Sequence, residues 1–167
     1  MNFQFYLEKL MASEDFQKFM EEYKDAFPCS GFFCLDKEGS DNKFHFDYYI
    51  PSDKKIFSFQ LENKVERVPL EKMDENVPSK IAMNYDFDFD FVEKLIFAEM
   101  ELKGIKNKIQ KVLYSLQNLD GKDFLIGTVF ISGLGMIKLK YDINEKKITD
   151  FEKKSFFDFM KVVKGKV

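Results

Sequence analysis

The first third of the chain carries Cys34, His45 and Asp47, the three residue types that thiol-dependent catalysis combines. A cysteine attacks as its thiolate, so it needs a neighbouring base such as histidine, and a carboxylate can hold that base in place. The three residues lie on two runs, 31–36 and 43–50, whose apolar and polar residues alternate as in half-buried strands. They are therefore candidate catalytic residues of a small thiol-dependent or hydrolytic enzyme.

Whether these side chains meet depends on how the two runs pair as a hairpin. A register that sets Asp36 opposite Lys43 also sets Cys34 opposite His45, with Asp47 two residues further along the same face. A flat strand face, however, lacks the donors that stabilise an oxyanion in such enzymes. We favour the simpler interpretation, in which a small half-buried cysteine lies beside a surface histidine. The sequence thus leaves enzymatic activity open and weighs against it.

The two cysteines do not match a metal site. Cys29 and Cys34 are five residues apart, and the chain contains one histidine. Structural zinc sites use closely spaced cysteine pairs and four ligands, so we predict neither a bound metal nor another cofactor.

Three aspartates, Asp86, Asp88 and Asp90, alternate with four aromatic residues in the segment 84–91. In an extended chain the carboxylates and the rings point to opposite sides. We expect the rings to enter the core, and Asp88 or Asp90 to cap the helix that follows. A calcium loop is not predicted, because phenylalanines occupy its glycine and glutamate positions. A weak cation site at Asp86–Asp90 is the alternative.

Composition and charge exclude several classes of protein. The chain has 167 residues, of which 45% are hydrophobic and 33% charged, which excludes a disordered or collagen-like protein. Its 26 basic and 29 acidic residues give a net charge of −3, so nucleic-acid binding would need a local basic patch. The lysines of the tail, from Lys153 to Lys166, are one such cluster, but we interpret them as a solvated face because arginine is almost absent.

The sequence also predicts a location. Residues 1–10 lack the basic and apolar regions of a signal peptide. The longest stretch without a charged residue, 124–137, is too short and too rich in glycine for a membrane span. We therefore expect a cytoplasmic protein that does not cross a membrane.

Periodicity predicts the elements that position the candidate residues. An amphipathic helix begins near Tyr6 and restarts at Ser13, and three strands follow. A second helix at 90–103 is followed by four strands. The predicted strands are 31–36, 43–50, 55–61, 111–119, 122–132, 136–143 and 148–152. Residues 105–116 also fit a helical stripe, but Asp120-Gly121 favours a hairpin at that point. A terminal helix capped by Ser155 completes the prediction.

These elements predict an α+β fold, in which helices pack on an antiparallel sheet, with halves at 1–76 and 77–167 that form one domain or two packed subdomains. Two short similarities, 6–14 with 91–99 and 53–59 with 145–151, occur in the same order in both halves. They indicate either a tandem duplication of an α-β-β-β unit or a chance match.

The second half, which closes on Tyr141-Asp-Ile-Asn-Glu-Lys-Lys-Ile-Thr-Asp150, resembles PepSY-type and cystatin-like modules. The resemblance implies a small sheet wrapped on a helix and a role in binding or peptidase inhibition. The chain departs from those modules at Glu145-Lys146, where they usually carry Thr-Gly, and in our expectation that it is not exported as they typically are. No functional residue is carried over from them.

Without a catalytic, phosphate-binding or metal motif, the sequence best fits a non-catalytic binding module for a protein or peptide partner. An inhibitor-like protein is one form of such a module. A homodimer is another, because Leu113, Phe124 and Ile126 lie on one face of the second hairpin and other apolar residues on the opposite face.

Overall fold

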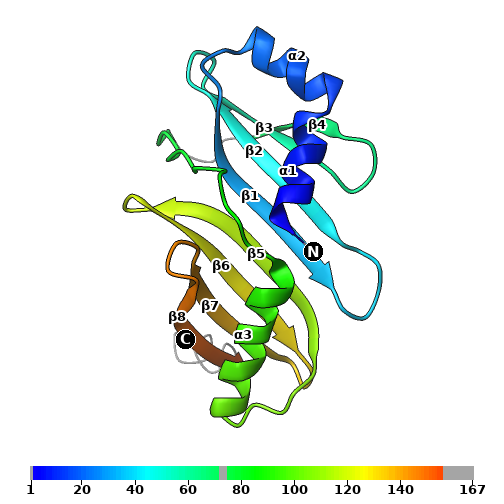
Figure 1. The fold of residues 1–167 in the computed structure, drawn as a ribbon, viewed down its shortest axis with the longest axis vertical. Coiled ribbons are helices and arrows are strands. Elements are labelled where there is room, and N and C mark those ends of the chain that lie inside the picture. The colour runs from blue at the N-terminus through cyan, green and yellow to red at the C-terminus, as the bar shows by residue number, and fades with distance from the viewer. Residues whose placement is uncertain (1, 72–74, 156–167) are drawn as a thin grey trace, which may run out of the picture.

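The computed structural model describes residues 2–71 and 75–155, in which helices lie against one face of a single antiparallel sheet (Figure 1). The helices are α1 (Phe3–Met11), α2 (Glu14–Glu22) and α3 (Phe89–Leu102). The strands are β1 (Phe27–Asp36), β2 (Lys43–Ile50), β3 (Lys55–Gln60), β4 (Glu66–Leu70), β5 (Ile109–Leu119), β6 (Lys122–Ile131), β7 (Gly135–Asp142) and β8 (Lys147–Ser155). The predicted α+β class is confirmed.

The strands form one eight-stranded sheet in the order β4-β3-β2-β1-β5-β6-β7-β8. Each half contributes a four-stranded meander, and the two meanders join where β1 pairs antiparallel with β5, with Phe33 opposite Tyr114. The segments 1–76 and 77–167 therefore share a continuous sheet, while the boundary between them stays a prediction.

Local signals explain where the helices begin. The Ser13 side chain accepts a hydrogen bond from the Phe16 amide at 3.4 Å, which caps α2 and divides the N-terminal helical region into two helices. The Asp88 side chain accepts from the Asp90 amide at 2.7 Å and caps α3. Both caps were among those expected from the sequence.

The hairpin interpretation of 105–120 is confirmed. Asp120 and Gly121 have φ values of 52° and 86°, and they join β5 to β6. This left-handed pair suits a two-residue hairpin turn, which a continuous helix could not contain. β4 was missed by the prediction because it is short, contains Pro69 and is largely exposed, so it lacks an alternating apolar pattern. The predicted helix after Ser155 lies outside the described residues.

An aromatic core fills the space between the helices and the sheet. The ring of Phe3 in α1 packs edge-on against the ring of Phe46, with 5.5 Å between the ring centres, and stacks on the ring of Phe87 at 5.0 Å. These contacts hold α1 against the sheet and against the segment before α3. This segment, 81–89, is irregular up to the start of α3 at Phe89, with Met83 in the left-handed region at a φ of 64°, and its alternate side chains from Ile81 to Phe89 are buried. It therefore runs along the core as a strap between the two halves.

The two halves share an internal geometry. A bulge interrupts the pairing of β1 with β2 after Pro28. A second bulge interrupts the pairing of β5 with β6 after Ile109, which is 81 residues later in the chain. Tyr114 is also 81 residues after Phe33, the residue it faces. The sequence similarities follow another spacing, however, because 53–59 leads into β3 whereas 145–151 leads into β8. The predicted duplication is therefore not confirmed.

Candidate functional site

The hairpin that carries Cys34, His45 and Asp47 has a different register from the predicted one. Cys34 lies opposite Lys43, and Phe32 lies opposite His45, so the pairing is shifted by two residues. A shift of two keeps Cys34 and His45 on the same face but does not place them directly across from each other.

Each of the three candidate catalytic side chains has its own neighbour. His45 pairs through Nε2 with the Glu62 carboxylate, and Asp47 accepts a hydrogen bond from the Ser30 hydroxyl at 2.7 Å. Cys34 is 3% exposed, and burial raises the pKa of its thiol. A protonated, buried thiol is a poor nucleophile, so the geometry lends the catalytic role no support, and that role stays a prediction for an activity assay.

The other cysteine is also shielded. Cys29 occupies the bulge of β1, and its Sγ lies 3.5 Å from the carbonyl oxygen of Asp47. Burial, followed by the nearby Asp47 carboxylate, raises the pKa of Cys29 to about 12. Both cysteines are free thiols.

The aspartate run before α3 behaves largely as expected. Tyr85, Phe87 and Phe89 are buried, whereas Asp86 is exposed. Phe91 differs, because the helix begins at Phe89 and the repeat changes there from two residues to 3.6, which turns this ring outward to 43% exposure. No group of three or more potential metal-ligating side chains occurs within residues 2–71 and 75–155.

A buried carboxylate that the sequence analysis missed lies at one end of β6. Asp123 is 7% exposed and accepts hydrogen bonds from the Ala82 amide at 2.9 Å, from the Asn118 side chain at 2.7 Å and from the Tyr85 hydroxyl. Burial, followed by the bond to Asp123, raises the pKa of Tyr85 above its usual value. Asp123 thus fastens the 81–89 strap to the second half of the sheet.

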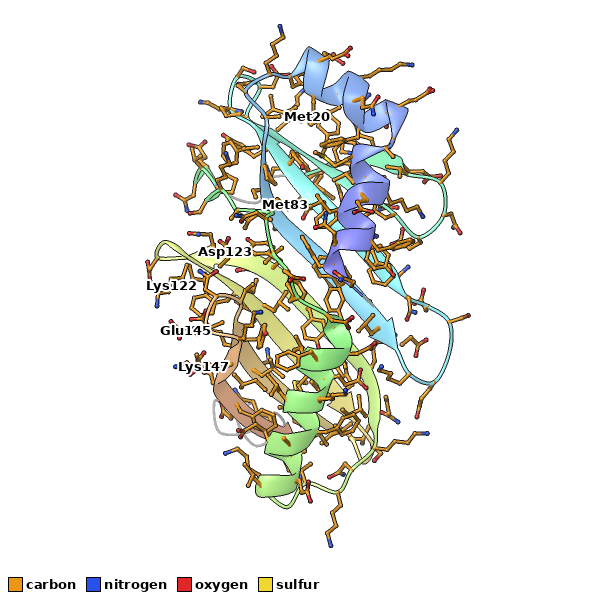
Figure 2. All side chains as sticks on the ribbon, viewed as in Figure 1. Met20, Met83, Lys122, Asp123, Glu145 and Lys147 are labelled. Carbon is orange, nitrogen blue, oxygen red and sulfur yellow. The ribbon has the colours of Figure 1, made fainter. Side chains whose placement is uncertain are left out.

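A cavity of about 470 Å³ opens beside Asp123. Figure 2 shows Asp123 close to the strap that carries Met83, with Glu145 and Lys147 at the same end of the sheet. Lys80, Lys146 and Asp86 also line this cavity, so both signs of charge occur. Because the donors around Asp123 are already used within the protein, the arrangement serves primarily to hold the strap.

The sheet face turned away from the helices is only partly apolar. Leu113, Phe124 and Ile126 are half-buried there, while Val112, Leu116 and Val129 are fully buried beneath the helices. The predicted assignment of these apolar residues to the two faces of the second hairpin is confirmed. On the outer face Lys140 pairs with Asp150 at 3.5 Å, and its ammonium lies 5.3 Å from the centre of the Phe124 ring.

Both edges of the sheet carry features that discourage pairing with another strand. β4 contains Pro69 and is mostly exposed. β8 alternates charged residues along its length, among them Glu152 and Lys154, which lie 4.0 Å apart. Proline and edge charges are the usual protection against strand addition.

The outer side of α3 carries three exposed large apolar side chains. Phe91, Phe97 and Leu102 are 43%, 50% and 81% exposed, although the opposite side of the same helix is fully buried by Val92 and Ile96. In Figure 1, α3 lies in front of β5–β8, and no other described element covers it. A helix that is apolar on both sides is normally buried on both sides, so this face indicates a contact surface.

No protein-family model matches the sequence, and no curated protein matches it. A crystal structure of a "putative lipoprotein" from Clostridium difficile 630 has a TM-score of 0.52 to this chain. The match covers 84% of this chain and 91% of that one at 17% sequence identity, so it concerns the fold alone. Within the described residues, every helix is too short or too polar to cross a bilayer.

Proposed function

We propose that the protein is a non-catalytic binding module that contacts a protein partner through the outer face of α3. The observation that carries this proposal is the exposure of Phe91, Phe97 and Leu102 on a helix whose opposite face is already buried in the core. Leaving three large apolar side chains in water forgoes the free energy that their burial would provide. A protein partner would recover it.

The remaining surfaces support a partner of this kind over other classes. The edges of the sheet resist addition of a peptide strand, and the described charges of both signs lie interspersed instead of forming a single basic stripe. The buried Cys34 thiol and the paired His45 favour binding over thiol chemistry.

We include a cytoplasmic location in the proposal. It is supported by Cys29 and Cys34, which lie buried as separate thiols, the form that a reducing compartment maintains. Fractionation of the source cells with an antibody to the chain tests it, and recovery in the membrane fraction would contradict it.

We also propose that the two halves derive from one helix-and-meander unit. The bulges after Pro28 and Ile109 support this origin, as does the central position of Phe33 opposite Tyr114. The test is to make each half, 1–76 and 77–167, as a separate chain. Related units should complement each other when mixed, and halves that stay unfolded together would count against it.

Native mass spectrometry of the full chain isolated from its source tests the binding function. We expect a complex with protein mass that is lost in the Leu102→Glu variant. Leu134→Glu is the matched control, because Leu134 is 65% exposed but lies in the β6–β7 turn. A complex that survives Leu102→Glu would contradict the assigned surface, and a bound metal or metabolite without protein would favour an enzyme.

A further inference from the structure

Four apolar residues of α3, three of them exposed, follow the pattern of a coiled-coil seam. Phe91, Leu95, Ala98 and Leu102 are spaced four, three and four residues apart. This spacing aligns side chains along one line of a helix and fits the apolar a and d positions of a heptad. We call these four residues the α3 seam. Phe91, Ala98 and Leu102 are exposed, whereas Leu95 is half-buried and packs partly against the core, so the seam runs along the border of the buried side of α3 and is open to another helix.

We propose that the occupant of the α3 seam is a second copy of this chain, whose α3 packs antiparallel to the first. This inference rests on the proposed function, since it names the partner of the same surface. In the antiparallel register, Phe91 of each copy meets Leu102 of the other, and Leu95 meets Ala98. Large side chains then fill the ends of the contact, and the small Ala98 allows the helices to approach in the middle.

The charged residues beside the seam match this orientation. Lys94 and Glu101 are exposed and occupy the same flank of α3, each immediately before a seam residue. In an antiparallel pair this flank meets its own counterpart, so Lys94 of each copy faces Glu101 of the other. Phe97 lies further around the helix, at a c position of the heptad, and stays outside this contact. The surface is thus complementary to itself in shape and in charge, as a two-fold interface requires.

The size of α3 sets the expected strength. One pair of 14-residue helices makes a small interface, so we expect a dissociation constant in the micromolar range. A membrane surface is the less suitable occupant, because an interfacial helix carries mainly lysine and arginine on its polar face, whereas here Asp90 and Glu101 accompany Lys94.

Sedimentation of the full chain, from low micromolar to several hundred micromolar, tests the proposal. We expect a reversible monomer–dimer equilibrium. Lys94→Glu should weaken the dimer roughly tenfold to thirtyfold, because it turns two attractive contacts into two repulsive ones. Glu101→Lys should do the same, and the double variant Lys94→Glu with Glu101→Lys should restore the wild-type constant. Lys18→Glu, an equal charge change on the exposed side of α2, should have no effect.

The other results separate the orientation, the partner and the function. Restoration by Lys94→Glu with Glu99→Lys instead would overturn the antiparallel register, because Glu99 is the partner of Lys94 in a parallel pair. A wild-type chain that stays monomeric but binds another protein, or anionic lipid vesicles, in a manner sensitive to Leu102→Glu would overturn the second copy. A monomer whose complexes ignore Leu102→Glu would overturn the proposed function as well. Equal melting temperatures of all variants in the monomeric range would show that they fold.

Discussion

Asp123 offers the most direct test of how this fold holds together. Its carboxylate is the acceptor for three donors, which belong to the strap residues Ala82 and Tyr85 and to Asn118 of β5. Replacing Asp123 by alanine removes the acceptor of all three hydrogen bonds at once. The strap then keeps its apolar contacts but loses its polar attachment to β6.

The magnitude follows from the number of bonds and from the cavity beside them. A hydrogen bond to a charged group contributes about 1.5–3 kcal/mol, and a buried donor left without a partner is costly. Water can enter the open cavity and satisfy part of this loss, so we expect Asp123→Ala to lower the free energy of unfolding by roughly 2–4 kcal/mol. Tyr85→Phe removes a hydroxyl that donates to Asp123 and accepts from the Ala82 amide at 3.0 Å, and because that amide keeps its bond to Asp123 we expect a cost of about 1 kcal/mol.

Urea denaturation of the full chain measures these changes, with Asp86→Ala as the matched control. Asp86 lines the same cavity and carries the same charge, but it is exposed, so its loss should change stability by less than about 0.5 kcal/mol. The double variant Asp123→Ala with Tyr85→Phe should lose less than the sum of the two single variants. Hydrogen exchange at the Ala82 amide should accelerate in Asp123→Ala. If Asp123→Ala cost no more than Asp86→Ala, the hydrogen bonds of Asp123 would not be what attaches the strap.

Three further predictions concern packing, ionisation and reactivity. Gly127→Ala should destabilise the fold by about 1–3 kcal/mol, because the new Cβ would lie 2.8 Å from the Leu139 side chain, and urea denaturation measures this loss. The double variant Gly127→Ala with Leu139→Ala should cost less than the sum of the two single variants, because removing the Leu139 side chain also removes the clash. Stability should fall as the pH rises above about 10, because burial raises the pKa of Tyr114, so the folded state retains a phenolic proton that the unfolded state releases; unchanged stability from neutral pH to above 10 would contradict this. Cys34 and Cys29 should react slowly with iodoacetamide in the folded chain and rapidly in denaturant, since both are buried with raised pKa values. Fast native alkylation of Cys34, together with a hydrolytic activity lost in His45→Ala, would restore the enzyme interpretation.

Much of the secondary structure could be read from local pattern. β2 occupies the predicted 43–50, and α3 is displaced by one residue from the predicted 90–103. Strand alternation, helical spacing and the Asp120-Gly121 turn are properties of neighbouring residues, so they can be recognised without knowing how the rest of the chain folds. The burial of Tyr85, Phe87 and Phe89 was predictable for the same reason.

The candidate catalytic group shows where this reasoning fails. A strand alternates with a period of two, so a shift of the β1–β2 pairing by two residues leaves the apolar pattern unchanged. The register is set by the six-residue loop between β1 and β2. At the start of this loop, the Asp36 carboxylate accepts hydrogen bonds from the backbone amides of Glu38, Gly39 and Asp41. The sequence pattern was compatible with Cys34 facing His45, but the folded loop places Lys43 there.

Local sequence patterns therefore predict the three described helices, every described strand except β4, the faces of most strands and the caps of α2 and α3, because each depends on residues a few positions apart. The pairing of β1 with β5, the attachment of the strap to Asp123 and the exposure of Phe91 and Leu102 depend instead on how distant parts of the chain pack together. Ala82 is 41 residues from Asp123, and no local pattern encodes a contact over that distance. The structure was needed to identify the exposed apolar side of α3, because helical spacing predicts a helix without stating which of its apolar sides packs against the core.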